Sequence, residues 1–198
     1  MFPLARFLAL YLKFFFLLTP FFVLGVFLSL TEEAEDALRN KLAVKISLGA
    51  AVTTLLIFLL GAQLMLLFDI TVDAFRIGAG ILLLLTAISL MNPKVVATKE
   101  GEDISVVPLA MPVIVGPASC GAIMVTSAEL HTIGAKLMGF AALAVALIFI
   151  WVILLLGTWF ERQLGKRGIS ILMRLTALIL AALSAQMVMT GVCGFLKG

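Results

Sequence analysis

The sequence has little charge and few of the side chains that carry out chemistry. Charged residues make up 13% of its 198 positions and hydrophobic residues 63%, whereas soluble domains carry about 25% charged residues. There is one histidine, His131, and the two cysteines, Cys120 and Cys193, are far apart and read as small packing residues. This composition excludes an ordinary soluble domain and indicates a protein with several transmembrane helices.

The long apolar segments lack acidic residues away from their ends. A proton relay or metal site in the bilayer would need buried carboxylates, histidines or thiolates, and a hydrolase would need a nucleophile beside a base. We therefore expect no enzymatic activity, no metal and no cofactor. The basic residues stand at the ends of apolar segments rather than in a patch with aromatics, so nucleic acid is not an expected partner.

Six apolar segments approach the roughly 20 residues that a spanning helix needs: 8–30, 47–68, 74–91, 106–127, 137–159 and 172–195. The fold class predicted is an all-α polytopic membrane protein, a single transmembrane domain of six transmembrane helices. Polar stretches at 32–45, 69–73, 92–103, 129–136 and 161–170 are the predicted loops. More of the 14 Lys and Arg residues fall on the face of the first of these loops, so both termini are expected outside.

Proline interrupts the first and the fourth of these segments, at Thr19-Pro20 and at Gly116-Pro117. A proline within a helix frees backbone polar groups, which a bilayer tolerates only where protein or a watery cavity satisfies them. The freed amides of a half-helix attract a carboxylate, and the freed carbonyls attract an ammonium group or a cation. The predicted substrate-binding residues are therefore Thr19, Pro20, Gly116, Pro117 and Ser119. Simple proline kinks filled by neighbouring helices remain the alternative.

The two halves of the chain, 1–91 and 92–198, resemble each other. Residues 76–91 align without gaps on 174–189, and Leu60-Gly61 matches Leu156-Gly157. Because three spans per half is an odd number, the halves must have opposite orientations, so two inverted three-helix repeats are expected. Arg76 and Arg174 open equivalent helices, and their predicted role is gating through pairs with Asp73 or Glu161. Snorkelling of the arginines to the membrane interface is the alternative.

Several motifs resemble those of the MarC family of bacterial and archaeal membrane proteins. They lie at residues 18–31, 75–83, 102–117 and 174–191, and the most specific runs from Glu102-Asp103 through Pro108-Leu109-Ala110 and Pro112 to Gly116-Pro117. The family is grouped with LysE-like exporters, and some members are regarded as neutral amino-acid transporters. The resemblance thus implies a multi-pass protein of the cell (inner) membrane that transports neutral amino acids.

The chain departs from the family pattern at the breaks themselves. Thr19-Pro20 stands where the family usually has Asn-Pro, Gly116-Pro117-Ala118 where it has Gly-Pro-Gly, and Ala79-Gly80 where it has a glycine pair. Two of these departures lie at the predicted site, so the family's substrate does not transfer directly.

Three functions follow from these observations. The first is a secondary transporter or facilitator of small neutral solutes, above all neutral amino acids, with alternating access between the repeats; sodium coupling and uncoupled flux are both open. The second is an ion or metal channel, which would need rings of charge or of carbonyls. The third is a non-transport scaffold or accessory protein, whose mark would be kinks filled by protein and no cavity. The expected partners are the lipid bilayer and a small neutral solute, and a homo-oligomer is left open.

Overall fold

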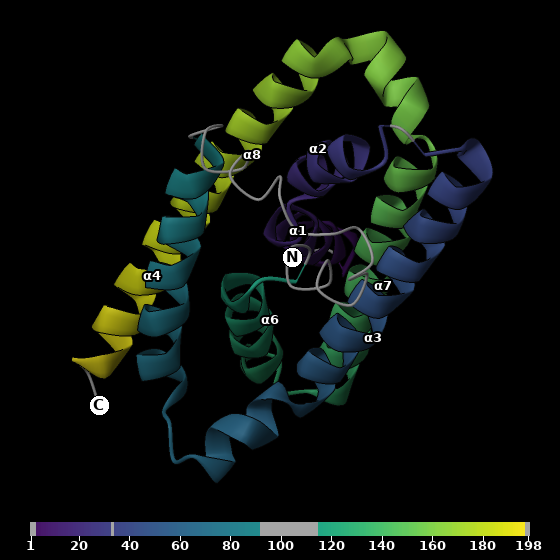
Figure 1. Ribbon diagram of the computed structural model, residues 1–198. Coiled ribbons are helices and arrows are strands. Elements are labelled where there is room, and N and C mark those ends of the chain that lie inside the picture. The colour runs from purple at the N-terminus through teal and green to yellow at the C-terminus, as the bar shows by residue number, and fades with distance from the viewer. Residues whose placement is uncertain (1–2, 33, 92–114, 197–198) are drawn as a thin grey trace.

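The computed structural model describes residues 3–32, 34–91 and 115–196, and the regular structure within them is entirely helical (Figure 1). The helices are α1 (Pro3–Leu17), α2 (Pro20–Leu30), α3 (Asp36–Leu67), α4 (Val72–Met91), α6 (Pro117–Glu129), α7 (Ile133–Leu155) and α8 (Gly157–Phe195). The predicted all-α class is confirmed. The predicted loop at 92–103, the start of the fourth span and most of the 102–117 motif lie outside the described residues.

Five described segments are long and apolar enough to cross a bilayer: Leu4–Leu30, Asp36–Leu67, Val72–Met91, Ile133–Leu155 and Gly157–Phe195. They correspond to five of the six predicted spans. The remaining predicted span is the fourth along the chain, 106–127, and its described part belongs to α6. The 13 residues of α6 reach only about 20 Å, against a hydrocarbon core of about 30 Å. Large apolar side chains such as Leu48, Ile148 and Leu178 are exposed on the outside of these helices, as a lipid-facing surface requires.

Two of the predicted loops are wrong. Helix α3 begins at Asp36, within the stretch 32–45, and α8 runs through the stretch 161–170. Hydropathy marks the part of a helix that lies in lipid, whereas charged helix-forming residues continue the same helix beyond it. Within α8 the backbone is non-helical only at Gly165, where φ is 63° and ψ is 171°. A positive φ of this kind suits glycine, so the basic stretch forms a bent helix.

Four helices, α3, α4, α7 and α8, form a ring that surrounds α1, α2 and α6 (Figure 1). Two pairs of neighbours, α4 with α8 and α3 with α7, make up its sides. The first pair is antiparallel and close, because the Ser184 hydroxyl donates to the Gly80 carbonyl at 2.7 Å and Gly191 lies against the backbone of Asp73. A Cβ at Gly80 would stand 2.7 Å from Val188, so the glycine is what permits this approach.

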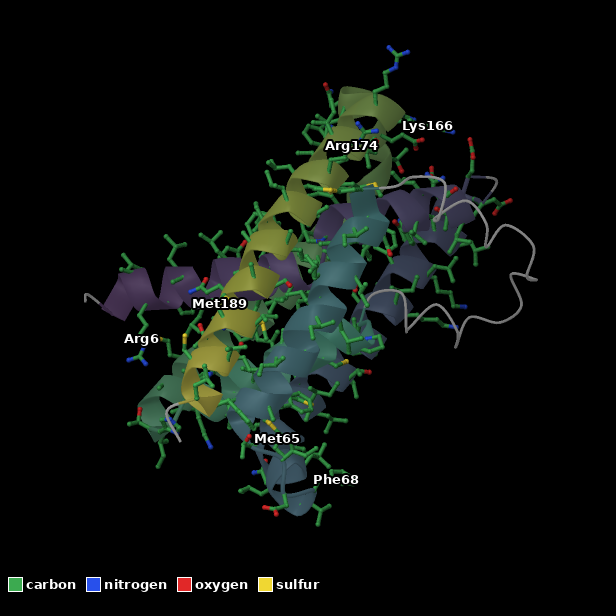
Figure 2. All side chains as sticks on the ribbon, turned by 90° about the vertical axis from the view of Figure 1, so that its left-hand side faces the viewer. Arg6, Met65, Phe68, Lys166, Arg174 and Met189 are labelled. Atoms are coloured by element: carbon green, nitrogen blue, oxygen red, sulfur yellow. The ribbon has the colours of Figure 1, made fainter. Side chains whose placement is uncertain are left out.

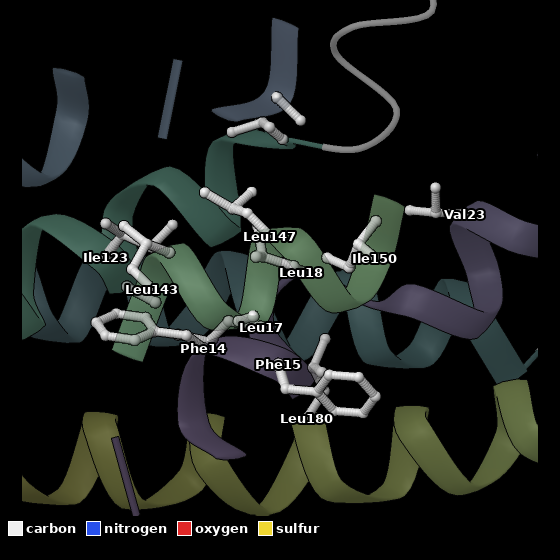
Figure 3. Close-up of a cluster of buried hydrophobic side chains, with 14 of the residues drawn as sticks. Phe14, Phe15, Leu17, Leu18, Val23, Ile123, Leu143, Leu147, Ile150 and Leu180 are labelled. Atoms are coloured by element: carbon white, nitrogen blue, oxygen red, sulfur yellow. The ribbon is translucent and has the colours of Figure 1, made fainter. Parts of the chain in front are cut away.

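The hydrophobic core fills the interior of the ring (Figure 3). Phe14, Leu17 and Leu18 at the end of α1 are completely buried, and they belong to one cluster with Ile123 of α6 and Leu143 of α7. The proline break after α1 therefore lies at the centre of the molecule rather than at its lipid-facing surface.

Candidate functional site

The first break consists of two residues, Leu18 and Thr19, between α1 and α2, and Thr19 has the unusual backbone. Its φ of 47° and ψ of 56° are left-handed, which is unusual for a β-branched residue. The Thr19 amide still donates to the Phe16 carbonyl at 3.0 Å, and the Thr19 carbonyl accepts from the Val23 amide at 3.1 Å. The Leu17 carbonyl, by contrast, is left to find a partner outside its own helix.

The second break supplies that partner. Helix α6 begins at Pro117, and Gly116 before it is extended, with φ −66° and ψ 162°. In the first turn of α6 the Ser119 hydroxyl donates to the Leu17 carbonyl at 2.6 Å. The two proline breaks, which lie 102 residues apart in the sequence at this bond, thus meet inside the ring.

The side chains at this meeting point are packed rather than open. Thr19 and Ser119 are each 5% exposed and Pro20 is buried, while Gly116 is half-buried and Pro117 is exposed. The bond from Ser119 to Leu17 therefore joins the two stretches that contain the predicted binding residues, and in this conformation protein fills the break at Thr19. Binding of a solute by these residues stays a prediction.

A cavity of about 500 Å³ lies beside the break, between α1 and α8. Small-molecule sites typically measure about 300–1,000 Å³. Its walls are largely apolar, with polar groups at one end, and the lining residues are Ala9, Leu12, Lys13, Phe16, Arg76, Glu129, Ile179, Leu183, Gln186, Met187 and Thr190. Phe16, whose carbonyl accepts the Thr19 amide, connects the cavity wall to the first break.

Four charged residues, Lys13, Asp73, Arg76 and Glu129, form a cluster at the polar end of the cavity. Arg76 donates through Nη2 to Glu129 Oε1 at 2.8 Å and through Nη1 to Asp73 Oδ1 at 2.5 Å. Lys13 Nζ lies 3.8 Å from the other oxygen of Glu129. The four-charge cluster therefore links α1, α4 and α6, and the Arg76 Nε within it is buried without a hydrogen-bond partner.

The other predicted gating residues are arranged differently. Arg76 pairs with Asp73 as the sequence suggested, but within the described part of the chain no ion pair joins Arg174 to Glu161. Arg174 is exposed and lies towards the end of the molecule opposite Phe68 (Figure 2). A gating role for either arginine stays a prediction.

Sequence reasoning missed Lys13 and Glu129. Lys13 lies near the start of the apolar run 8–30 and Glu129 opens the predicted loop 129–136, so both come under the general expectation that charges stand at segment ends. One signal was present: a lysine inside the apolar run 8–30 is unusual for a transmembrane segment and often marks a functional position. Only the fold shows that Lys13 meets a carboxylate from α6.

The fold and the site define a polytopic helical membrane protein, in which the break at Thr19 and the start of α6 meet inside a ring, with a charged cavity beside them. The chain matches the description "MarC family integral membrane protein" over residues 4–196 and belongs to this family. The family resemblance of the sequence motifs is thereby confirmed.

Relatives align over almost their whole length. The UPF0056 membrane protein YhcE of Escherichia coli is 31% identical, over 95% of this chain and 94% of its own length. The UPF0056 membrane protein MJ1677 of Methanocaldococcus jannaschii is 34% identical over 92% and 93%, and the E. coli UPF0056 inner membrane protein YhgN is 30% identical over the same shares. No solved structure matches the chain.

Proposed function

We propose that this protein is a secondary transporter or facilitator of small neutral solutes, above all neutral amino acids, with alternating access between two inverted repeats. The observation that carries the proposal is the hydrogen bond from Ser119 to the Leu17 carbonyl. It places both proline breaks at one point inside the ring, where discontinuous helices of transporters bind their solutes.

Contacts exchanged between the halves support the inverted repeats. Gly61 of α3 lies against Met124 of α6, and the matching Gly157 lies against Leu24, Leu28 and, at the greatest distance of the three, Phe27 of α2. Counted from the two prolines, Phe27 and Met124 occupy the same position in their half-helices. A helix of each half therefore packs, at an equivalent glycine, against the half-helix of the other half: α3 against α6, and α8 against α2. A two-fold axis in the membrane plane would require this arrangement.

The cavity favours transport over a purely structural role. Packed breaks are common to a closed transporter and to a scaffold, and the cavity of about 500 Å³ with charged and apolar walls gives a transported solute a place to bind. The described residues contain no group of three or more His, Cys, Asp or Glu able to hold a metal ion, which gives no support to a metal channel. We propose transport without chemical conversion or a cofactor, because a hydrolase needs a nucleophile beside a base and the apolar segments lack acidic residues away from their ends.

The protein would reside in the cell membrane, in bacteria the inner membrane, with both termini outside. One relative carries "inner membrane protein" in its own name. The excess of Lys and Arg on the opposite face supports this orientation.

Flux measurements in liposomes test the proposed function. Purified protein should mediate uptake of at least one of glycine, alanine, serine and threonine. Pro117→Ala should abolish that uptake, because the helix would continue through the second break, while gel filtration and circular dichroism show a folded protein. Wild-type protein that moves none of the four amino acids would refute the proposal in this form.

A further inference from the structure

We infer that Lys13 and Glu129 form the subsite that holds the charged ends of the solute, the carboxylate at Lys13 and the ammonium group at Glu129. The inference rests on the proposed transport function. It concerns the cavity between α1 and α8, and neither residue belongs to the proline breaks.

The contact between these two residues is loose and leaves hydrogen-bonding capacity on both of them. Glu129 Oε1 is held by Arg76 at 2.8 Å, whereas Glu129 Oε2 faces Lys13 Nζ at 3.8 Å, beyond hydrogen-bond distance. An ammonium group on a lysine has three donors. Lys13 and Glu129 are 25% and 38% exposed, and both line the cavity. A solute can therefore replace their loose contact with two closer ones.

Arg76 acts as the positioning residue of this subsite. Its guanidinium bonds Asp73 as well as Glu129, and its side chain is only 12% exposed. The bond to Asp73 holds the planar guanidinium in place, and the bond from Nη2 then holds Oε1 of the Glu129 carboxylate. Glu129 Oε2, which does not bond Arg76, is consequently held on the side of Lys13 before a solute binds.

The charge of the cluster selects for a solute with no net charge. Lys13 and Arg76 are positive and Asp73 and Glu129 are negative, so the four-charge cluster is neutral. A zwitterion adds one charge of each sign and preserves that balance. A net anion or cation would bring an unpaired charge into a partly desolvated site, which is unfavourable.

The apolar walls account for the rest of the solute. Leu12 and Phe16 of α1 face Leu183 and Met187 of α8 across the cavity. A small aliphatic side chain fits such a wall. Phe16 also stands directly before Leu17, whose carbonyl is bound by Ser119, so a solute in this cavity contacts the end of the broken helix.

The test is alanine uptake into liposomes with two competing analogues. Alaninamide keeps the ammonium group and lacks the carboxylate, and N-acetylalanine keeps the carboxylate and lacks the ammonium group. In the wild type each analogue should inhibit at least about tenfold more weakly than unlabelled alanine, because each leaves one charged residue without a partner. Analogues that inhibit as well as alanine would overturn the inference.

Variants assign the two ends. Lys13→Gln should raise the KM for alanine about tenfold or more and leave inhibition by alaninamide unchanged. Glu129→Gln should raise the KM similarly and leave inhibition by N-acetylalanine unchanged. Lys136→Gln and Glu35→Gln, both at exposed positions outside the cavity, are the matched controls and should behave as the wild type.

The outcomes separate this inference from the function on which it rests. A wild type that moves no neutral amino acid refutes the transport function itself. A wild type that moves alanine, with wild-type KM values in Lys13→Gln and Glu129→Gln, refutes only the subsite. If a variant does not fold, the wild-type competition with the two analogues still decides the matter.

Discussion

Replacing Ser119 by alanine removes the bond between the two breaks and should destabilise the protein measurably. The Leu17 residue is completely buried, and Ser119 Oγ is the one donor that the described residues offer to its carbonyl. A buried acceptor left without a partner costs about 1–3 kcal/mol. Bonds between helices in membranes average about 0.6 kcal/mol and reach about 1.7, because the separated groups find other partners. We expect a loss of about 1–2 kcal/mol, since the break at the left-handed Thr19 has already left the Leu17 carbonyl without a helical partner.

Ser89→Ala provides the matched control. The Ser89 hydroxyl also donates to a backbone carbonyl, that of Leu85, at 2.9 Å, but it does so at the exposed surface of α4. The Leu85 carbonyl lies within a continuous helix, where it keeps its backbone partner after the substitution. The free energy of unfolding should therefore change by less than about 0.5 kcal/mol.

Thermal unfolding of the purified protein in detergent, followed by circular dichroism, measures both variants. For a chain of this size 1 kcal/mol corresponds to about 2–4 °C in Tm, so Ser119→Ala should melt about 2–8 °C below the wild type. Equal Tm values for Ser119→Ala and Ser89→Ala would refute the reasoning. That result would mean that the Leu17 carbonyl gains another hydrogen-bond donor when the Ser119 hydroxyl is removed.

Three further substitutions test other parts of the structure in the same unfolding assay. Thr19→Asn should stabilise the protein by about 0.5–1 kcal/mol, because asparagine adopts the left-handed conformation more readily than threonine; a lower Tm would contradict this account of the break. Arg76→Gln should destabilise it by about 1–3 kcal/mol, since two partly buried carboxylates lose their cation, whereas the exposed Arg174→Gln should change little. Gly61→Ala should cost about 1–3 kcal/mol, because its Cβ would lie 2.6 Å from a side-chain atom and 3.0 Å from the backbone of α6. Gly157→Ala, whose added Cβ would have its nearest atom at 3.3 Å, should cost less. Equal losses of stability in the two variants would contradict the closer packing of α6 against Gly61.

Local features of the sequence were sufficient to predict the helical class and the position of the breaks. Apolar runs of spanning length and prolines within them act on neighbouring residues only, so their effect can be read without a fold. The same local reasoning placed a turn at 129–136, where α6 ends at Glu129 and α7 begins at Ile133. It failed at 161–170, because charge signals exposure to water and does not end a helix.

The contacts that make up the candidate site could not be predicted in this way. The Ser119 bond to Leu17 and the Glu129 pair with Lys13 join segments more than 100 residues apart. Nothing in the local sequence distinguishes Ser119 from the other hydroxyl residues of the spans. The alignment of the two halves indicated that the breaks are equivalent, but two equivalent positions of a repeat need not be in contact.

The two ends of the ring are closed by different chemistry, and this relates the cavity to one of them. At the end where α3 begins, Arg39 donates to the Thr31 carbonyl at 2.6 Å and to the Thr158 hydroxyl at 2.9 Å, which ties α2, α3 and α8 together through neutral oxygens. An exposed ion pair at the same end, Lys166 Nζ to Glu32 Oε1 at 2.9 Å, adds a second link to α8. At the end where α4 begins, Arg76 instead binds carboxylates, and the cavity lies beside them. Alternating access requires that one end be closed while the other receives the solute. On the proposed mechanism this conformation is therefore closed at Arg39 and has its solute space at Arg76. A charged solute can compete for a carboxylate such as Glu129 more readily than for the neutral oxygens that Arg39 binds at hydrogen-bond distance. On the proposed mechanism, opening of that end therefore requires movement of the helices and loss of the exposed pair between Lys166 and Glu32.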